Sequence, residues 1–333
     1  MTGGKAARWA VAALAALVVQ GSCIAPAATG GQARVGPVKP GAPAASKGAA
    51  PKPAISLAND HSTKPVAATA AAARALIQTG FSYEGPKVQG GALIGTAPAG
   101  TVRLSLGGAP VPITNDGHFL IAFDRDSGPS AVLVATLENG RQVSDTIMIA
   151  KRAWNLERLD SLPRIAQPTA DFNRLRPPEI AQINAARRIN GDSDGWRQHF
   201  LWPAVGRLSG MFGSQRIYKN GEAGSYHSGT DIAQPSGAPV IAPADGVVVL
   251  AADHPFTLEG NLLMIDHGMG LNSAFLHLSR IDVKLGERVA RGQRIGAVGM
   301  TGRATGPHLH WSMKWRDAKI DPSLIAGPAP VVQ

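Results

Sequence analysis

From Phe81 onward, the chain alternates short apolar runs with residues that favour turns. The runs TVRLSL (101–106), HFLIAF (118–123), AVLVATL (131–137) and VSDTIMIA (143–150) are separated by NDG (115–117) and ENG (138–140). Asn-Gly and Asp-Gly between alternating runs are strong hairpin signals, because these residues accept the positive φ angles of tight turns. The pattern predicts a mainly β fold, with a small β-sandwich domain over residues 81–152.

The first 80 residues have a composition that does not favour a packed core. No aromatic residue occurs between Ala10 and Gly80, and residues 29–80 are rich in Ala, Pro, Gly and Lys. Such a segment buries too little apolar surface to offset the entropy lost on ordering. We therefore expect a disordered linker over residues 29–80, with a short helix over 68–78, where alanines are concentrated.

The amino terminus is typical of an export signal. Lys5 and Arg8 precede an apolar stretch over residues 9–19, and Ala25-Pro26-Ala27 offers a small-x-small cleavage site. The apolar stretch is shorter than the roughly 20 residues that a membrane-spanning helix needs. We expect a signal peptide over residues 1–28 and a protein exported to the periplasm or cell envelope.

Cys23 is the single cysteine of the chain, so no intramolecular disulfide can form. It offers a lipid-attachment site, but Gln20 stands where lipoprotein signals usually carry Leu. Lipid anchoring at Cys23 is therefore the weaker alternative.

The positive charge is concentrated outside the predicted domains. The chain carries a formal net charge of +10, divided as +7 over residues 1–80, zero over 81–195 and +3 over 196–333. This distribution does not favour a nucleic-acid groove on a folded domain. A basic tail suits weak attraction to an anionic envelope surface, and a solvated tail without a partner explains the lysines equally well. Nothing in the sequence indicates an oligomeric state.

Residues 153–200 are predicted to connect two domains through a helix. The segment PPEIAQINAARRIN (177–190) has apolar residues about three positions apart at Ile180, Ile183, Ala186 and Ile189. Prolines at its start favour a helix that begins there and docks through one apolar face.

The side chains suited to metal chemistry occur in three segments of the carboxyl-terminal part. YHSGTDIAQPSG (226–237) contains His227 and Asp231, SAFLHLS (273–279) contains His277, and GPHLHW (306–311) contains His308 and His310. Alternate residues of a strand share a face, so His308 and His310 are expected to point the same way. Three protein ligands and one open position are typical of catalytic zinc, and His227, Asp231 and His310 can supply the three.

The other histidines have no such frame, and we interpret them as surface or structural residues: His61, His118, His199, His254 and His267.

Residues 203–322 resemble the lysostaphin-type zinc endopeptidases, which cut peptidoglycan cross-links. The resemblance rests on GMFGSQRI, YHSGTDIAQPSGAPVIAPADGVVV, GNLLMIDHGMGLNSAFLHLS, VKLGERVARGQRIGAVGMTGRATGPHLHW and a final Asp-Pro at 321–322. It implies a two-sheet antiparallel metallopeptidase domain with a groove, over residues 201–325, followed by a tail over 326–333.

The resemblance also implies roles for the five side chains. His227, Asp231 and His310 would ligate one zinc ion, while His277 and His308 would line its open side and act as the catalytic residues. The implied reaction is hydrolysis of a peptide cross-link of peptidoglycan through a zinc-activated water. A bond from D-alanine to diaminopimelate is the expected target, and a glycyl-glycine bond is the second.

Two other functions deserve comparison with the zinc endopeptidase. A non-catalytic cell-wall-binding activator of another murein hydrolase shares this fold, but such proteins usually lack some of the five residues. A biotinyl or lipoyl carrier domain has a similar VxxGxxVxxGQxIGxVG rhythm, but no lysine stands at a suitable hairpin tip.

Two further expectations concern the groove. Phe275 stands where family members often have tyrosine, which predicts that a groove hydroxyl is absent. Trp196, Phe200 and Trp202 are bulky residues at the domain entrance, which suggests that the connector shields the groove.

Overall fold

The structure is a computed structural model that describes residues 79–159 and 169–330. The prediction of a mainly β fold is confirmed: antiparallel sheets dominate, and the described residues contain two α-helices. The expected signal peptide and nearly all of the expected linker lie outside the described residues. No helix within 79–159 or 169–330 is long and apolar enough to cross a membrane.

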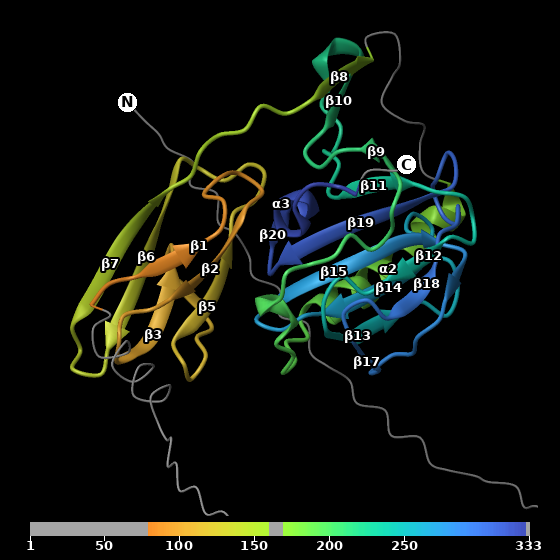
Figure 1. Ribbon diagram of the computed structural model, residues 1–333. Helices are drawn as coiled ribbons and strands as arrows, with labels where there is room; N and C mark the ends of the chain where they lie inside the picture. Colours follow the sequence, from red (N-terminus) through yellow and green to blue (C-terminus); the bar gives the residue numbers. More distant parts are fainter. Residues whose placement is uncertain (1–78, 160–168, 331–333) are drawn as a thin grey trace, which may run out of the picture. The chain divides into compact units, whose positions relative to one another are not determined.

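Seven strands between residues 82 and 148 form two antiparallel sheets (Figure 1). One sheet has the order β1-β2-β5, and the other has the order β4-β3-β6-β7. Their bounds are β1 Ser82–Glu84, β2 Ala92–Thr96, β3 Thr101–Leu106, β4 Ala109–Val111, β5 His118–Ala122, β6 Ser130–Leu137 and β7 Gln142–Met148. The predicted turns at 115–117 and 138–140 are confirmed, since Gly117 and Gly140 have φ angles of 81° and 80°.

The segment after these strands contains a strand that the sequence did not predict. Strand β8 (Leu156–Leu159) pairs in parallel with β10 (Gln215–Tyr218), far along the chain. The 3₁₀-helix η1 (Gly195–Arg197) follows in the chain, and η2 (Lys219–Gly221) comes directly after β10.

The helix predicted over 177–190 is observed as α2 (Ala170–Arg187), which both begins and ends earlier in the chain. The predicted positions of its two ends were therefore wrong. Thr169 caps the amino terminus by accepting a hydrogen bond from Phe172 N at 3.2 Å, and this cap fixes the start. Pro177 and Pro178 consequently lie inside the helix. Of the four predicted apolar positions, Ile183 and Ala186 are buried, whereas Ile180 and Ile189 are exposed.

An eight-stranded antiparallel sheet forms the centre of the carboxyl-terminal part, with the order β17-β13-β14-β15-β19-β11-β9 and β20 paired to β19 (Figure 1). The strands are β9 Arg207–Gly210, β11 Thr230–Ala233, β13 Gly246–Ala251, β14 Asn261–Asp266, β15 Leu271–Leu278, β17 Arg288–Val289, β19 His308–Trp315 and β20 Ala318–Ile320. A second sheet has the order β12-β18-β16, with β12 Pro239–Ile241, β16 Arg280–Ile281 and β18 Arg294–Ala297. Helix α3 (Pro322–Ala326) follows β20. The boundaries 81–152, 153–200 and 201–325 stay predictions.

The two faces of β19 have different surroundings. Leu309, Trp311 and Met313 are fully buried in the main core, where the ring of Trp311 lies 5.8 Å from that of Trp202. The alternate residues, from His308 to Lys314, lie on the opposite face. That second face is the one on which the polar side chains gather.

Trp196, Phe200 and Trp202 are core residues, exposed by at most 7%. Their rings pack inside the domain rather than at its entrance, so they do not support the expectation that the connector shields the groove, which stays a prediction.

Candidate metal centre

The pairing of β11 with β19 brings together two of the predicted ligands. Asp231 lies directly opposite His310, and Ala233 lies opposite His308. Directly opposed side chains of an antiparallel pair lie on the same face within contact distance. Nδ1 of His310 is 2.7 Å from Oδ1 of Asp231.

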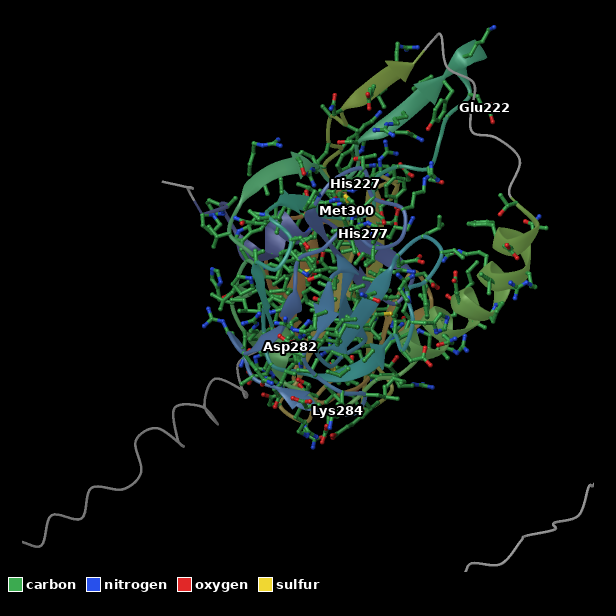
Figure 2. The ribbon with its side chains drawn as sticks, turned by 90° about the vertical axis from the view of Figure 1, so that its right-hand side faces the viewer. Glu222, His227, His277, Asp282, Lys284 and Met300 are labelled. Atoms are coloured by element: carbon green, nitrogen blue, oxygen red, sulfur yellow. The ribbon has the colours of Figure 1, made fainter. Side chains whose placement is uncertain are left out.

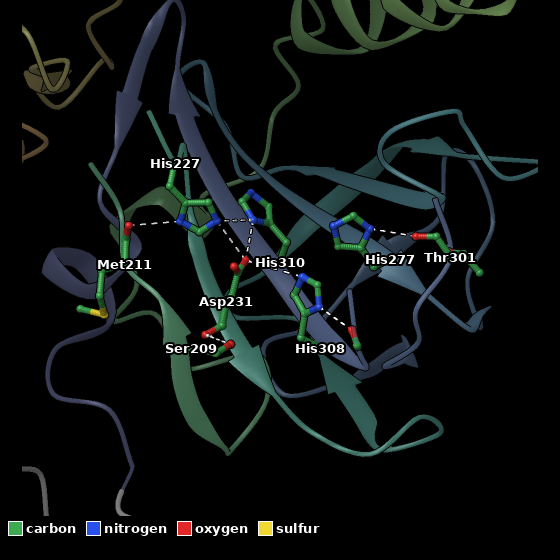
Figure 3. Close-up of polar contacts among 9 residues, drawn as sticks. Ser209, Met211, His227, Asp231, His277, Thr301, His308 and His310 are labelled. Atoms are coloured by element: carbon green, nitrogen blue, oxygen red, sulfur yellow. Dashed lines mark hydrogen bonds and ion pairs between the residues drawn. The ribbon is translucent and has the colours of Figure 1, made fainter. Parts of the chain in front are cut away.

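His227 reaches the same point from the loop before β11 (Figure 3). Its Nε2 lies 3.1 Å from both Oδ1 of Asp231 and Nδ1 of His310. Its Nδ1 lies 3.1 Å from the carbonyl oxygen of Met211, which can only accept a hydrogen bond. The proton therefore belongs on Nδ1, and the lone pair of Nε2 faces the other two side chains.

These three side chains form a candidate metal site. One ligand atom from each of His227, Asp231 and His310 lies within 4.8 Å of the others. Two imidazole nitrogens and one carboxylate oxygen are donors that Zn²⁺ accepts at about 2.0–2.2 Å, and a three-residue set leaves a position for water or substrate. The carbonyl acceptor behind His227 is the type of partner that orients metal-binding histidines. The residues present thus fit a zinc ion.

The charges within this cluster depend on one another. Burial opposes ionisation of Asp231, but its close contacts with the rings of His227 and His310 outweigh burial and hold the pKa of its carboxyl far below the usual range. Burial lowers the pKa of His310. Burial also acts on His227, where the hydrogen bond with Asp231 outweighs it and raises the pKa. An ionised carboxylate beside a neutral imidazole is the protonation state that a divalent cation needs.

His277 and His308 lie beside this cluster with their ring centroids 4.8 Å apart. Nδ1 of His277 is 2.9 Å from the carbonyl oxygen of Thr301, and Nδ1 of His308 is 2.8 Å from that of Gly306. Both carbonyls accept a proton held on Nδ1, so each Nε2 keeps its lone pair. Burial lowers the pKa of His277, which favours the neutral ring.

The Nε2 atom of His308 lies 3.8 Å from Oδ1 of Asp231, beyond hydrogen-bond distance. His308 therefore shares a face with His310 but does not share its contact with the carboxylate. Figure 2 shows Asp282 and Lys284 at the end of the domain opposite His227 and His277, so the site occupies one end.

His277 adopts an unusual backbone conformation, with a φ angle of 63°. The left-handed region is rare for residues other than glycine, and it is found where surrounding contacts enforce it. Here the backbone N–H of His277 donates to the carbonyl of Glu259 at 2.8 Å, in the region where the β14–β15 pairing shifts register. The irregular strand end thus turns His277 toward His308.

Two glycines next to the ligands were missed as functional positions. A Cβ added at Gly210 would lie 2.3 Å from Oδ2 of Asp231, and one at Gly229 would lie 2.8 Å from Nε2 of His310. Any side chain at either position would displace a candidate ligand. The signal in the sequence was the glycine itself, in GMFG and HSGTD.

Phe275 was predicted to leave the groove without a hydroxyl, but its side chain does not lie at the site. It is fully buried and lies opposite Trp311, whose side chain points into the main core. The expectation of a lost groove hydroxyl was wrong, because position 275 faces away from the cluster.

The remaining described histidines have structural contacts. His267 is buried between the carbonyl of Asp245 and the hydroxyl of Ser273, at 2.8 and 2.9 Å. His118, His199 and His254 contact only neighbouring residues in the sequence through their ring nitrogens. His61 lies outside the described residues.

A family model described as peptidase family M23 matches residues 225–322, which contain all five side chains of the site. This segment is an M23 peptidase domain. Its antiparallel sheet and its His-Asp-His cluster agree with the resemblance to lysostaphin-type enzymes seen in the sequence.

Two curated relatives match part of the chain. Peptidoglycan DD-endopeptidase ShyA from Vibrio cholerae is 47% identical over 133 residues, which are 40% of this chain and 30% of that protein. DD-carboxypeptidase/endopeptidase Mpg from Neisseria meningitidis is 38% identical over 124 residues, which are 37% of this chain and 28% of that protein. The matched region thus spans less than a third of either relative.

One solved structure is similar over a larger part of the chain. A putative peptidase M23 from Pseudomonas aeruginosa superposes with a TM-score of 0.56 at 29% identity, covering 72% of this chain and 95% of that one. The likeness therefore extends beyond residues 225–322.

Proposed function

We propose that this protein is an exported, zinc-dependent endopeptidase that hydrolyses peptide cross-links of bacterial peptidoglycan. The observation that carries the proposal is the grouping of His227, Asp231 and His310 beside two further histidines that the cluster does not use. A purely structural metal site has no need for two further imidazoles at its edge.

A zinc ion held by the three side chains would polarise the scissile carbonyl and lower the pKa of a water at the open position. The chain itself supplies the proton transfers. His277 and His308 each hold a proton on Nδ1 through a backbone carbonyl, which leaves Nε2 to accept a proton from water. The same ring then donates that proton to the leaving amine. The geometry suits either histidine for this role.

The bond from D-alanine to diaminopimelate is the proposed target. Support comes from the similarity to ShyA, whose name describes a DD-endopeptidase, and to Mpg, whose name describes a DD-carboxypeptidase/endopeptidase. A glycyl-glycine bond has no stereocentre and does not fit that specificity.

Export to the periplasm or cell envelope is part of the proposal. It is supported by the basic and apolar pattern of residues 1–28 and by the location of the proposed substrate. Two secondary proposals accompany export. They are contact of the basic tail with an anionic envelope surface and lipid anchoring at Cys23.

A defined substrate tests the proposed reaction. A purified muropeptide dimer joined by a D-alanyl-diaminopimelate bond is incubated with the zinc-loaded chain, and the products are identified by mass spectrometry. We expect two monomers of the masses given by hydrolysis of that bond, and none with the His308→Ala variant. An intact dimer after incubation with the zinc-loaded chain would contradict the proposal.

A further inference from the structure

The candidate site continues into a cavity that ends at helix α2. The cavity has a volume of about 90 Å³, enough for several groups the size of a water molecule. His310 and Ser228 line it at the metal end, Ser312 lies further along β19, and Ile183 and Arg187 line it from α2. Glu259, whose oxygens accept hydrogen bonds from Arg176, also lines it. The cavity thus connects the centre to a helix outside the M23 match.

Helix α2 is fixed in this place by a buried ionic network. Oε1 of Glu179 accepts a hydrogen bond from Thr257 N at 2.7 Å, and Oε2 accepts one from the hydroxyl of the same threonine at 2.6 Å. Arg176 donates to both oxygens of Glu259, at 2.5 and 2.8 Å. The residues that α2 presents to the cavity are therefore held on a rigid element.

Arg187 is the one charged side chain of α2 in the cavity lining. Its Nε atom is buried and has no hydrogen-bond partner within residues 79–159 and 169–330. Burial lowers the pKa of its guanidinium, and the negative charge of Glu259 only partly opposes that effect. Both oxygens of Glu259 accept hydrogen bonds from Arg176, and no hydrogen bond joins Glu259 to Arg187 in the part of the chain that the structure describes.

A buried Nε–H without a partner is costly, since this donor has lost water and gained no acceptor. The planar fork of arginine matches a carboxylate, with which it forms two parallel charge-assisted hydrogen bonds. An anionic group in the cavity would remove the cost.

The surroundings of Arg187 add further positive charge. Lys314 lies on the same face of β19 as Ser312, and its pKa is lowered first by burial and then by the nearby charge of Arg187. Arg187 also lines a second cleft, together with Arg188, Lys314 and Arg316, in which Asp317 is the only acidic residue. These positive charges outnumber the carboxylates of Glu259 and Asp317 and favour an anion at the α2 end of the site.

We propose that Arg187 is a specificity residue that binds a free carboxylate of the peptide substrate. The inference rests on the proposed function and names the group that the site recognises. Ser312 lies two residues beyond His310 on β19, or roughly 7 Å along the strand. Because Arg187 and His310 line the same small cavity, we assign this carboxylate to a residue beside the scissile bond, which in the proposed substrate is diaminopimelate.

The experiment compares two peptides that differ only at that carboxylate, which is free in one and amidated in the other. Fluorescent, cross-linked stem peptides are titrated into the full chain after removal of metal, so that binding is measured without cleavage. We expect the free carboxylate to bind at least roughly tenfold more tightly, as a charge-assisted bidentate pair should. The Arg187→Gln variant should bind both peptides equally weakly, and Arg187→Lys should keep part of the preference.

Arg188→Gln is the matched control, because Arg188 is exposed and lines the second cleft but not the cavity. The Arg188→Gln variant loses the same charge as Arg187→Gln and should keep the preference for the free carboxylate. Thermal unfolding of each variant identifies any loss of folding, and the lysine variant tests the site if the glutamine variant does not fold.

The outcomes separate the two proposals. Equal binding of both peptides by the unaltered chain, or a preference that persists in Arg187→Gln, would overturn the role of Arg187. Hydrolysis of the dimer by the zinc-loaded chain would uphold the proposed reaction in either case. A preference lost only in the Arg187 variants would support the carboxylate site even if neither peptide were cleaved.

Discussion

Asp231 lies directly opposite His310 in the antiparallel pair β11–β19, with Oδ1 of Asp231 2.7 Å from Nδ1 of His310. Strand register alone therefore places a carboxylate and an imidazole on one face of the sheet. A shift of one strand by one residue would leave these two side chains on opposite faces of the sheet. The site depends on the sheet as much as on the ligands.

Removal of the His310 ring should abolish both zinc binding and hydrolysis. In His310→Ala, two of three donors remain, and the ring that contacts both Asp231 and His227 is lost. We expect zinc content near zero by elemental analysis and no release of muropeptides. One equivalent of zinc in the purified variant would show that His310 is not a ligand.

His277→Ala should keep the metal and lose the reaction. His277 contacts Thr301 and the ring of His308, and it lies outside the three-residue cluster. A lost general acid or base lowers the rate on the order of a hundred- to ten-thousandfold. Zinc content and hydrolysis are measured on the same sample, with the exposed His254→Ala as control. A variant without zinc would contradict this division of roles.

Glu179→Ala should destabilise the protein by undocking α2. The side chain is 3% exposed and accepts two hydrogen bonds from Thr257. Its loss leaves both donors of Thr257 without an acceptor and removes one of the two carboxylate partners of Arg176, which costs about 2–4 kcal/mol of unfolding free energy.

Chemical unfolding measures this effect, and Asp171→Ala is the matched control on the same helix. Asp171 is exposed and pairs only with Arg174, so its removal should change stability by less than about 1 kcal/mol. Equal effects of the two substitutions would show that Glu179 does not anchor α2.

His267 should make the fold sensitive to acid. Complete burial lowers its pKa to about 4, below the ordinary value of 6.5, so the unfolded chain takes up the proton first as the pH falls. Stability from this residue is present above pH 6.5 and is lost as the pH falls toward 4. Between pH 7.5 and 5 the loss is about 2 kcal/mol.

Urea unfolding of the metal-free protein at the two pH values measures that loss, and His267→Gln provides the comparison. We expect His267→Gln to be less stable at both pH values. Its loss of unfolding free energy between pH 7.5 and 5 should be smaller than that of the unaltered chain by about 2 kcal/mol. An identical pH dependence in both proteins would exclude His267 as the group responsible.

The strands and the ligands were predicted from local patterns. The run at 101–106 coincides with β3, and the turns at 115–117 and 138–140 contain glycines with positive φ angles. Alternation along a strand is a local property, so His308 and His310 could be assigned to one face from sequence alone. The contact between His310 and Asp231 is a property of the sheet and needed the fold.

Features that depend on distant contacts were not predicted. The start of α2 was placed too late because Pro177 was interpreted as the first turn, whereas Thr169 supplies the cap. Arg187 looked like any surface arginine of a helix. Its unsatisfied Nε became visible only once α2 was packed against β13 and β14.

The most direct test of the account is to titrate zinc into the metal-free chain while its hydrolysis of purified peptidoglycan is followed. We predict that soluble muropeptides appear in proportion to bound zinc, up to one equivalent, and that His308→Ala binds the same zinc without releasing them. Hydrolysis by the metal-free chain, or one equivalent of bound zinc with no hydrolysis of any wall, would contradict it.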